Sequence, residues 1–301
     1  MKIAALRDDR IGEFLDYCRM YRCQLDGSYL SDEDLGHFRP DSQNPTYVLL
    51  DCDGRITAAA SLMVDEYHTR GRSGRLRILH SSIPMLPLYQ MLLSAIVSEC
   101  RELDRIFTFV PLANAELIRC IDELGFGVER YSFFLVRDNM TVPAADLPVG
   151  FTIRPFQCGC DEASWCEVRN AAFAHLKGND TPISPDMVAK VMSGSDQIEG
   201  ASLIMAHSGR AIGVIRGAHD EYDGKPTMNV GPLAILPEYQ GRGLGRTLLR
   251  ALLRVADEMS FAGTSLCVNA ENVRALSLYL QEGFRQVEAV ACYCYDLSMG
   301  S

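Results

Sequence analysis

Long apolar segments are absent from this sequence of 301 residues. No run of hydrophobic residues approaches the roughly 18 that a membrane-spanning helix needs. The first residues, Met1 to Asp9, also lack the hydrophobic core of a secretory signal peptide. We therefore expect a soluble, cytoplasmic protein that has no membrane as a partner.

Positive charge is scarce as well. The chain has 29 lysine and arginine residues against 39 aspartate and glutamate residues, which gives a formal net charge of −10. A field of this sign repels nucleic acids, so we expect no nucleic acid as a partner, and a polyanionic ligand would need its own local cations. The composition is otherwise that of a globular protein, and the length allows two domains of about 150 residues.

Residue clusters with the spacing of metal ligands are also missing. The 11 cysteines are odd in number and scattered, which is typical of reduced thiols in the cytosol. The pairs Cys158-Gly-Cys160 and Cys292-Tyr-Cys294 could suggest a metal, but no histidine accompanies them. Two thiols on one face of a strand are the simpler interpretation. We predict that the protein has no metal site.

Three glycines at alternate positions are the most informative feature that is present. Gly241, Gly243 and Gly245 follow an apolar run that ends at Pro237, and leucines at helical spacing come after them. The pattern predicts a strand, a tight turn and a helix. Backbone N–H groups at a helix start lack intrahelical partners and attract anions. Glycines let an anion as bulky as a diphosphate approach them closely.

Several kinds of phosphate loop compete for this turn. A Walker loop is excluded because no Gly-Lys-Ser/Thr occurs, and a Rossmann turn fits poorly because the glycines run G-x-G-x-G. The later strand, Thr264 to Val268, also offers no carboxylate for a ribose. The segment Gln240 to Gly245 resembles the Q/R-x-x-G-x-G/A signature of the GCN5-related N-acetyltransferase (GNAT) superfamily. A glycine-rich turn before a surface helix remains the alternative.

A second motif follows about 30 residues later. Asn272 is placed to cap a helix on which Ala275 and Tyr279 share one face, and Gly283 is placed for a left-handed C-cap that turns Phe284 into the core. This segment resembles the N-x-x-A-x-x-x-Y-x-x-x-G-F helix of the same superfamily. Without that resemblance, Tyr279 would be interpreted as an ordinary core residue.

The resemblance implies an acetyl-CoA-dependent N-acetyltransferase that acts on a primary amine by direct attack in a ternary complex, with no metal. It also implies the residues that bind acetyl-CoA, which are Leu233, Ala234, Ile235, Gln240, Gly241, Arg242, Gly243, Leu244, Gly245, Arg246, Asn272, Ala275 and Tyr279.

Two of these residues are implied to be catalytic. The backbone N–H of Leu233 would face the thioester oxygen, that of Ile235 would face the pantetheine arm, and Tyr279 would protonate the departing sulfur. Pro232 supports this arrangement, because proline inside a strand signals an edge or a bulge where pairing is broken.

The general base stays open. Histone-acetylating members of the superfamily have a glutamate four residues before the position of Leu233, where this chain has Asn229. No carboxylate on that strand can therefore serve, and several residues elsewhere are candidates: His175, His219, Asp220, Glu221 and Glu238. The segment from Ala174 to Lys190 is expected to form part of the acceptor pocket.

Cations for the coenzyme phosphates are expected from the helix after the turn. Arg242 and Arg246 are near enough to its start to reach a phosphate, and Arg274 could approach the nucleotide. Arg250 and Arg254 are expected to form a solvated stripe on the same helix.

An internal duplication is indicated by a constant offset of 158 positions, which places residues 86–110 on 244–268 without gaps. We expect an α/β fold of two tandem GNAT-like domains, each a mixed, mostly antiparallel, twisted sheet flanked by helices. The expected division is a degenerate domain at 1–138, a linker at 139–150 and an acetyltransferase domain at 151–301.

The first half lacks the features that bind the coenzyme in the second. Residues 82–87, which align with Gln240 to Gly245, contain two prolines and no glycine, and Ile121 stands where Tyr279 does. We expect that this half has lost coenzyme binding. A different class of function, a catalytically weak acyl-CoA-binding sensor or scaffold, also fits a chain without the glutamate.

Overall fold

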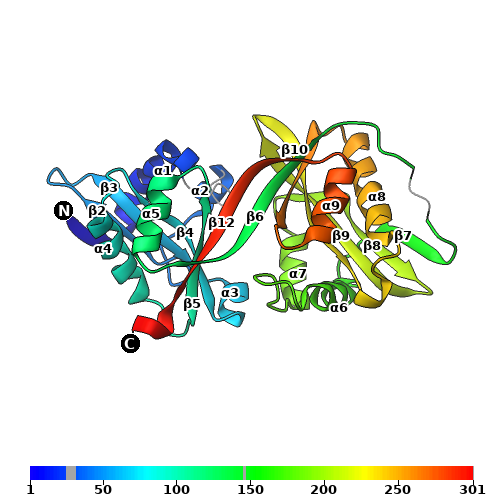
Figure 1. Cartoon of the computed structure of the whole chain (residues 1–301), viewed down its shortest axis with the longest axis horizontal. Helices are drawn as coiled ribbons and strands as arrows, with labels where there is room; N and C mark the ends of the chain where they lie inside the picture. The colour runs from blue at the N-terminus through cyan, green and yellow to red at the C-terminus, as the bar shows by residue number, and fades with distance from the viewer. Residues whose placement is uncertain (25–31, 145–146, 301) are drawn as a thin grey trace. The chain divides into compact units, whose positions relative to one another are not determined.

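The computed structural model describes residues 1–24, 32–144 and 147–300 (Figure 1). The chain forms two compact units. The first unit is Met1–Ser132 together with Glu288–Ser301, and the second is Phe133–Val287. Each unit combines a mixed sheet with helices, which confirms the predicted α/β architecture.

The sheet of the first unit has the strand order β1-β2-β3-β4-β5-β12. Its neighbours pair in antiparallel fashion except β4 and β5, which are parallel. The strands are β1 (Lys2–Ala5), β2 (Thr46–Leu50), β3 (Ile56–Met63), β4 (Ser73–Ser81), β5 (Arg105–Pro111) and β12 (Arg285–Asp296).

Helices cover both faces of this first sheet. Side chains alternate between the faces of a strand, and the buried residues of β2 divide accordingly. Val48 packs in one core with Phe14 of α1, whereas Leu49 packs in another with Leu92 of α4. The helices are α1 (Ile11–Met20), α2 (Asp32–His37), α3 (Glu66–Arg70), α4 (Leu86–Val97) and α5 (Ala115–Glu123).

The sheet of the second unit has the strand order β6-β11-β10-β9-β8-β7. Strands β7 to β10 pair in antiparallel fashion, and β10 and β11 are parallel. The strands are β6 (Gly127–Asp138), β7 (Phe151–Pro155), β8 (Gln197–His207), β9 (Arg210–Tyr222), β10 (Lys225–Ile235) and β11 (Gly263–Asn269).

One helix of the second unit lies unusually close to its sheet. A Cβ atom built on Gly217 of β9 would lie 3.1 Å from Leu252, and one on Gly213 would lie 3.3 Å from Leu248. Both leucines belong to α8, so these glycines let the helix and the strand approach each other. The helices of this unit are α6 (Glu162–Phe173), α7 (Pro185–Met192), α8 (Leu244–Glu258) and α9 (Val273–Gln281).

The division into units differs from the expected boundaries at 138 and 151. Residues 133–138 of β6 belong to the second unit, and the chain from Glu288 onward belongs to the first. Strand pairing explains the difference, because β5 takes its antiparallel neighbour from the end of the chain, with Val290 opposite Pro111 and Asp296 opposite Arg105. Prolines mark the expected linker in the sequence, but they do not indicate that the end of the chain pairs with β5 of the first unit.

The internal duplication is visible in the element bounds. A shift of 158 positions converts the bounds of β5, α5 and β6 into those of β11, α9 and β12 without any remainder. The same shift takes the first residue of α4 to the first residue of α8. The two halves therefore repeat one arrangement of strands and helices.

Candidate active site

Strand β10 contains the irregularity that Pro232 predicts. Its antiparallel register with β9 shifts between Val230, which is opposite Gly217, and Leu233, which is opposite Ile215. Two residues of β10 therefore stand opposite one residue of β9, as in a β-bulge. The prediction of broken pairing at Pro232 is confirmed.

Beyond this bulge, β10 presents two N–H groups on the side that faces away from β9. The N–H of Leu236 donates to the carbonyl of Ile212 in β9 at 2.9 Å. Because N–H groups alternate along a strand, those of Leu233 and Ile235 point in the opposite direction. The parallel register with β11 covers Thr227 to Asn229, before these residues are reached.

The glycine turn joins β10 to α8 as the sequence predicts. Gly241 and Gly243 have φ angles of +76° and +79°, which side chains other than glycine disfavour. A Cβ atom built on either residue meets no atom within 4 Å, so the space above the turn is open. Gly245 differs, since it lies inside α8 and a Cβ there would make an ordinary contact of 3.8 Å with Ile235.

Backbone donors converge at the start of α8. The N–H of Thr247 donates to the carbonyl of Gly243 at 3.1 Å and opens the helical hydrogen-bond series. The N–H groups of Leu244, Gly245 and Arg246 precede that bond and have no intrahelical acceptor. The helix start is therefore able to bind an anion, in agreement with the sequence.

Several predicted coenzyme-binding residues also have structural contacts. The Gln240 amide donates to the carbonyl of Ile235 at 2.9 Å and so ties the turn to the strand. Ala234 and Leu244 are 2% exposed, so only their backbone atoms could reach a ligand. Ala275 is half-buried in α9.

Helix α9 has both predicted caps. The Asn272 side chain accepts a hydrogen bond from the N–H of Ala275 at 3.2 Å. Gly283 has a φ of +90°, and the N–H of Phe284 donates to the carbonyl of Tyr279 at 3.0 Å, which is the Schellman arrangement. The rings of Phe284 and Tyr279 meet edge to face at 5.7 Å.

Tyr279 is held in the core by this cap. The residue is 8% exposed, and burial raises its pKa to about 12. Among the described residues, none forms a hydrogen bond with its hydroxyl group. The phenol therefore stays protonated at neutral pH and can serve as a proton donor.

The arginines of α8 are arranged differently from the expected stripe. Arg250 forms a double hydrogen bond of 2.7 and 2.9 Å with the carboxylate of Glu282, whose side chain is 2% exposed. Arg254 donates to the carbonyl of Pro143 at 3.1 Å. Arg250 is therefore not part of a solvated stripe, whereas Arg254 is half-buried and keeps an exposed hydrogen bond.

The two arginines nearest the turn contact different segments of the chain. Arg242 donates to the carbonyl of Glu238 at 2.8 Å and lies over the ring of Tyr239. Arg246 contacts Gln281 and also Glu282, at 3.3 Å. Glu282 therefore joins α8 to the end of α9. Sequence reasoning missed this residue, since no local pattern connects a helix-terminal glutamate with arginines more than thirty residues away.

The candidate bases lie in different places. His219 packs against Phe261 with ring centroids 5.6 Å apart, and Glu238 pairs with Arg210 at 3.2 Å. His175 and Glu221 are exposed. Among these five candidate bases, all of which the structure describes, only Asp220 forms side-chain hydrogen bonds to both β10 and β11.

The segment expected to form the acceptor pocket is fixed to α6. The side chain of Asn170 donates to the carbonyl of Ile183 at 2.9 Å and accepts from its N–H at 3.0 Å. Arg169 donates to the carbonyl of Thr181 at 2.6 Å. These bonds order the connection between α6 and α7, and its role in acceptor binding stays a prediction.

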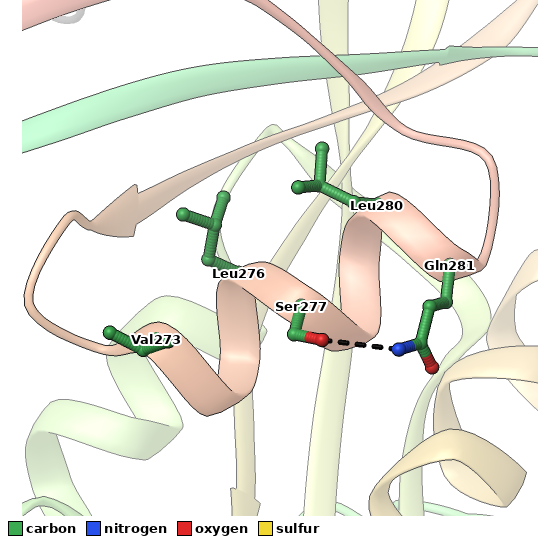
Figure 2. Close-up of a pocket in the computed structure, with 5 residues that line it drawn as sticks. All are labelled: Val273, Leu276, Ser277, Leu280 and Gln281. Atoms are coloured by element: carbon green, nitrogen blue, oxygen red, sulfur yellow. Dashed lines mark hydrogen bonds between the residues drawn. The ribbon is translucent and has the colours of Figure 1, made fainter.

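A hollow of about 380 Å³ lies along the outer face of α9 (Figure 2). Its lining residues recur at helical spacing, and Gln281 donates to Ser277 at 3.1 Å across it. They are Val273, Leu276, Ser277, Leu280 and Gln281. Tyr279 is not among them, so the hollow is separate from the predicted proton donor.

Within residues 1–24, 32–144 and 147–300, no group of three or more potential metal ligands occurs, and ten cysteines are free. In the same residues, no helix has the length and apolar character that crossing a membrane would require.

Part of the chain matches a known protein family. Residues 179–284 match the model of the Acetyltransferase (GNAT) family. Mycothiol acetyltransferase of Pseudarthrobacter chlorophenolicus is 30% identical over 175 residues, which cover 54% of each chain. The chain spans about half the length of the curated relatives it matches.

Solved structures share the fold over the whole chain. A GCN5-related N-acetyltransferase from Sphaerobacter thermophilus has a TM-score of 0.75 at 16% identity and covers 98% of this chain and 95% of its own. A tandem GNAT protein from the clavulanic acid biosynthesis pathway has a TM-score of 0.70 at 14% identity and covers 98% of both chains. Residues 179–284 therefore resemble the GNAT family in sequence, and the chain has the fold of tandem GNAT proteins.

Proposed function

We propose that this protein is an acetyl-CoA-dependent N-acetyltransferase that acetylates a primary amine by direct attack in a ternary complex. The junction of β10 and α8 carries the proposal. There, two N–H groups of β10 point away from β9, and three more open α8 beside a glycine turn. Donors in these positions match a thioester carbonyl and a diphosphate.

The residues at this junction fit acetyl-CoA. Open space above Gly241 and Gly243 leaves room for a diphosphate against the backbone. Arg242, which is exposed, would supply the positive charge that the acidic chain lacks. The remaining residues that would hold the coenzyme are those expected from the sequence, with Ala234 and Leu244 contributing backbone atoms alone.

Two groups would act on the reacting atoms. The N–H of Leu233 would stabilise the negative charge that develops on the carbonyl oxygen. Tyr279 would give its proton to the departing sulfur. Burial raises the pKa of this phenol to about 12, so it is protonated at neutral pH and would donate its proton as negative charge builds on the sulfur. Bound acetyl-CoA supplies the activated acyl group.

The acceptor class is proposed from the relatives. The matched curated proteins are named mycothiol acetyltransferases, and a cysteinyl amine such as Cys-GlcN-Ins is therefore the first acceptor to consider. The connection between α6 and α7, which Asn170 fixes, would form part of the acceptor pocket.

Turnover in a defined panel tests the proposal. Purified protein is incubated with acetyl-CoA and Cys-GlcN-Ins, glucosamine or a lysine peptide, and the release of free coenzyme thiol is followed. We expect release that depends on one of the amines. Acetyl-CoA that neither binds nor turns over would contradict the proposal.

A second function is favoured by one observation, the presence of Asn229 where histone-acetylating relatives have a glutamate. A protein without a base could be an acyl-CoA sensor or scaffold. Tight binding of acetyl-CoA with no turnover of any amine between pH 6 and pH 10 would support that alternative.

A further inference from the structure

Three polar side chains from neighbouring strands meet where β10 and β11 separate. They are Asp220 of β9, Asn229 of β10 and Ser265 of β11. The hydroxyl of Ser265 donates to Oδ2 of Asp220 at 2.7 Å. The amide of Asn229 lies 3.4 Å from the same oxygen and 3.2 Å from the Ser265 hydroxyl.

The strand registers place this cluster beside the bulge. Asn229 and Ser265 form the last parallel pair of β10 and β11. Ala218 stands opposite Asn229, and Asp220 follows Ala218 by two residues, so its side chain lies on the same face of the sheet. The cluster therefore stands four residues before Leu233, on the strand whose N–H groups point away from β9.

Three hydrogen-bond donors converge on the carboxylate of Asp220. Besides the two side-chain donors on Oδ2, the N–H of Glu221 donates to Oδ1 at 2.9 Å. A carboxylate can accept several hydrogen bonds, and its oxygens keep further acceptor positions. Ser265 is fully buried whereas Asp220 is exposed, so one side of the carboxylate is anchored and the other is open to a ligand.

We propose that Asp220 is the proton acceptor for the amine, in place of the glutamate whose position is occupied by Asn229. This inference rests on the proposed acetyltransferase function. Asn229 and Ser265 act as positioning residues that hold the carboxylate at the end of the β10–β11 ladder.

An N–H bond of the ammonium group breaks, and the proton moves to an Asp220 oxygen, directly or through a water molecule. The neutral amine then forms the N–C bond, and the C–S bond breaks. The sulfur takes the phenolic proton of Tyr279, which recovers one from the nitrogen of the new amide, and Asp220 later releases its proton to solvent.

Other charged or titratable groups lie on the same three strands. Arg216 on the same strand pairs with Asp196 at 2.7 Å. Lys225 lies near the start of β10, and Cys267 follows Ser265 by two residues in β11. His219 points to the opposite face, so among the candidate bases of β9 only Asp220 is anchored to β10 and β11.

The test measures kcat/KM against pH for acetyl-CoA and Cys-GlcN-Ins. For Asp220→Asn we expect a loss of about 10² or more at pH 7, the range of general-base catalysis. The loss should shrink as the pH rises toward the pKa of the amine, because the neutral form then needs no base. Asp220→Glu should retain part of the activity, and Glu221→Gln, which removes the adjacent exposed carboxylate, should change it less than about twofold.

A relocated carboxylate gives a second test that does not depend on the loss alone. In Asp220→Asn combined with Asn229→Asp, the carboxylate moves to the strand position of the missing glutamate, and we expect activity to return at pH 7.

The outcomes separate this inference from the function on which it rests. Calorimetry should show unchanged acetyl-CoA binding in Asp220→Asn. A variant that binds and turns over like the wild type at every pH would overturn the role of Asp220 and leave the acetyltransferase function intact. A wild-type protein that neither binds acetyl-CoA nor acetylates an amine would overturn both.

Discussion

The two halves of this chain repeat one arrangement and differ where a strand passes into a helix. In the second unit, residues 236–243 join β10 to α8, and in the first unit, residues 82–85 join β4 to α4. Both units keep a register shift before this connection. The comparison shows that the bulge persists in a unit that has no glycine turn.

The first unit fills the corresponding position with side chains. Counted from the first parallel pair of each sheet, His80 of β4 corresponds to Ala234 of β10. His80 is 2% exposed, and its Nδ1 forms a hydrogen bond of 2.7 Å with the Tyr17 hydroxyl, while its Nε2 lies 3.0 Å from the side-chain oxygen of Gln24. Where the second unit has a small residue, the first has a buried polar network.

Replacing the connection between β10 and α8 should have the largest effect. If residues 236–243 are exchanged for Ser82-Ile-Pro-Met85, the glycine turn disappears and proline removes an N–H donor. We expect acetyl-CoA binding to fall by at least about 10³, since each lost charge-assisted hydrogen bond costs about 1.5–3 kcal/mol. Calorimetry measures this, and circular dichroism checks folding. An unchanged affinity for acetyl-CoA would show that the glycine turn does not distinguish the second unit from the first in coenzyme binding.

Tyr279→Phe should lower kcat by about 10² while leaving acetyl-CoA affinity within about twofold, because only the proton donor is lost. The control is the corresponding Ile121→Val in the first unit, which should leave kcat unaltered and cost about 1 kcal/mol of stability. Steady-state kinetics would show the difference, and an equal kcat in Tyr279→Phe would exclude the tyrosine from the reaction.

His80 should make the first unit sensitive to acid. Burial lowers its pKa to about 4, below the ordinary value of about 6.5 in the unfolded chain. The unfolded state then binds more protons, so this contribution is fully present above about pH 6.5 and is lost as the pH falls toward about 4, up to about 3 kcal/mol.

Urea unfolding of His80→Leu between pH 4 and 7 tests this effect against His175→Gln, a change at an exposed histidine. The His80 variant should show a weaker pH dependence than the wild type. Parallel pH dependences for wild type and His80→Leu would contradict the assignment.

Glu282→Gln should loosen the link between α8 and α9. The first unit has Leu124 at the corresponding position, so this link belongs to the second unit. We expect a loss of about 1–2 kcal/mol, smaller than for a fully buried pair because Arg250 is 21% exposed. Asp138→Asn, at an exposed pair separated by 3.9 Å, should cost less than about 0.5 kcal/mol in the same thermal unfolding experiment.

Local signals predicted much of this structure. Asn272 and Gly283 fix the ends of α9 through their own hydrogen bonds and backbone angles, and Pro232 marks the bulge. Such features depend on a few neighbouring residues, so the sequence reveals them. The constant offset between the halves also survives folding, because β5, α5 and β6 have the same lengths as β11, α9 and β12.

Local sequence signals do not predict contacts between residues that lie far apart in the sequence. Nothing near Val290 indicates that it pairs with Pro111, and nothing near Arg250 indicates Glu282. From the sequence alone, Asp220 is one of several candidate bases. The registers of three strands place it beside Asn229 and Ser265. These contacts depend on which strands become neighbours, and periodicity does not encode that choice.

Titration of the purified chain with acetyl-CoA in a calorimeter tests the central claim most directly. One coenzyme should bind per chain, and binding should persist in His80→Leu and disappear when residues 236–243 are replaced. Absence of binding to the wild-type chain, or binding that survives the replacement, would contradict the assignment of the coenzyme site to the turn before α8.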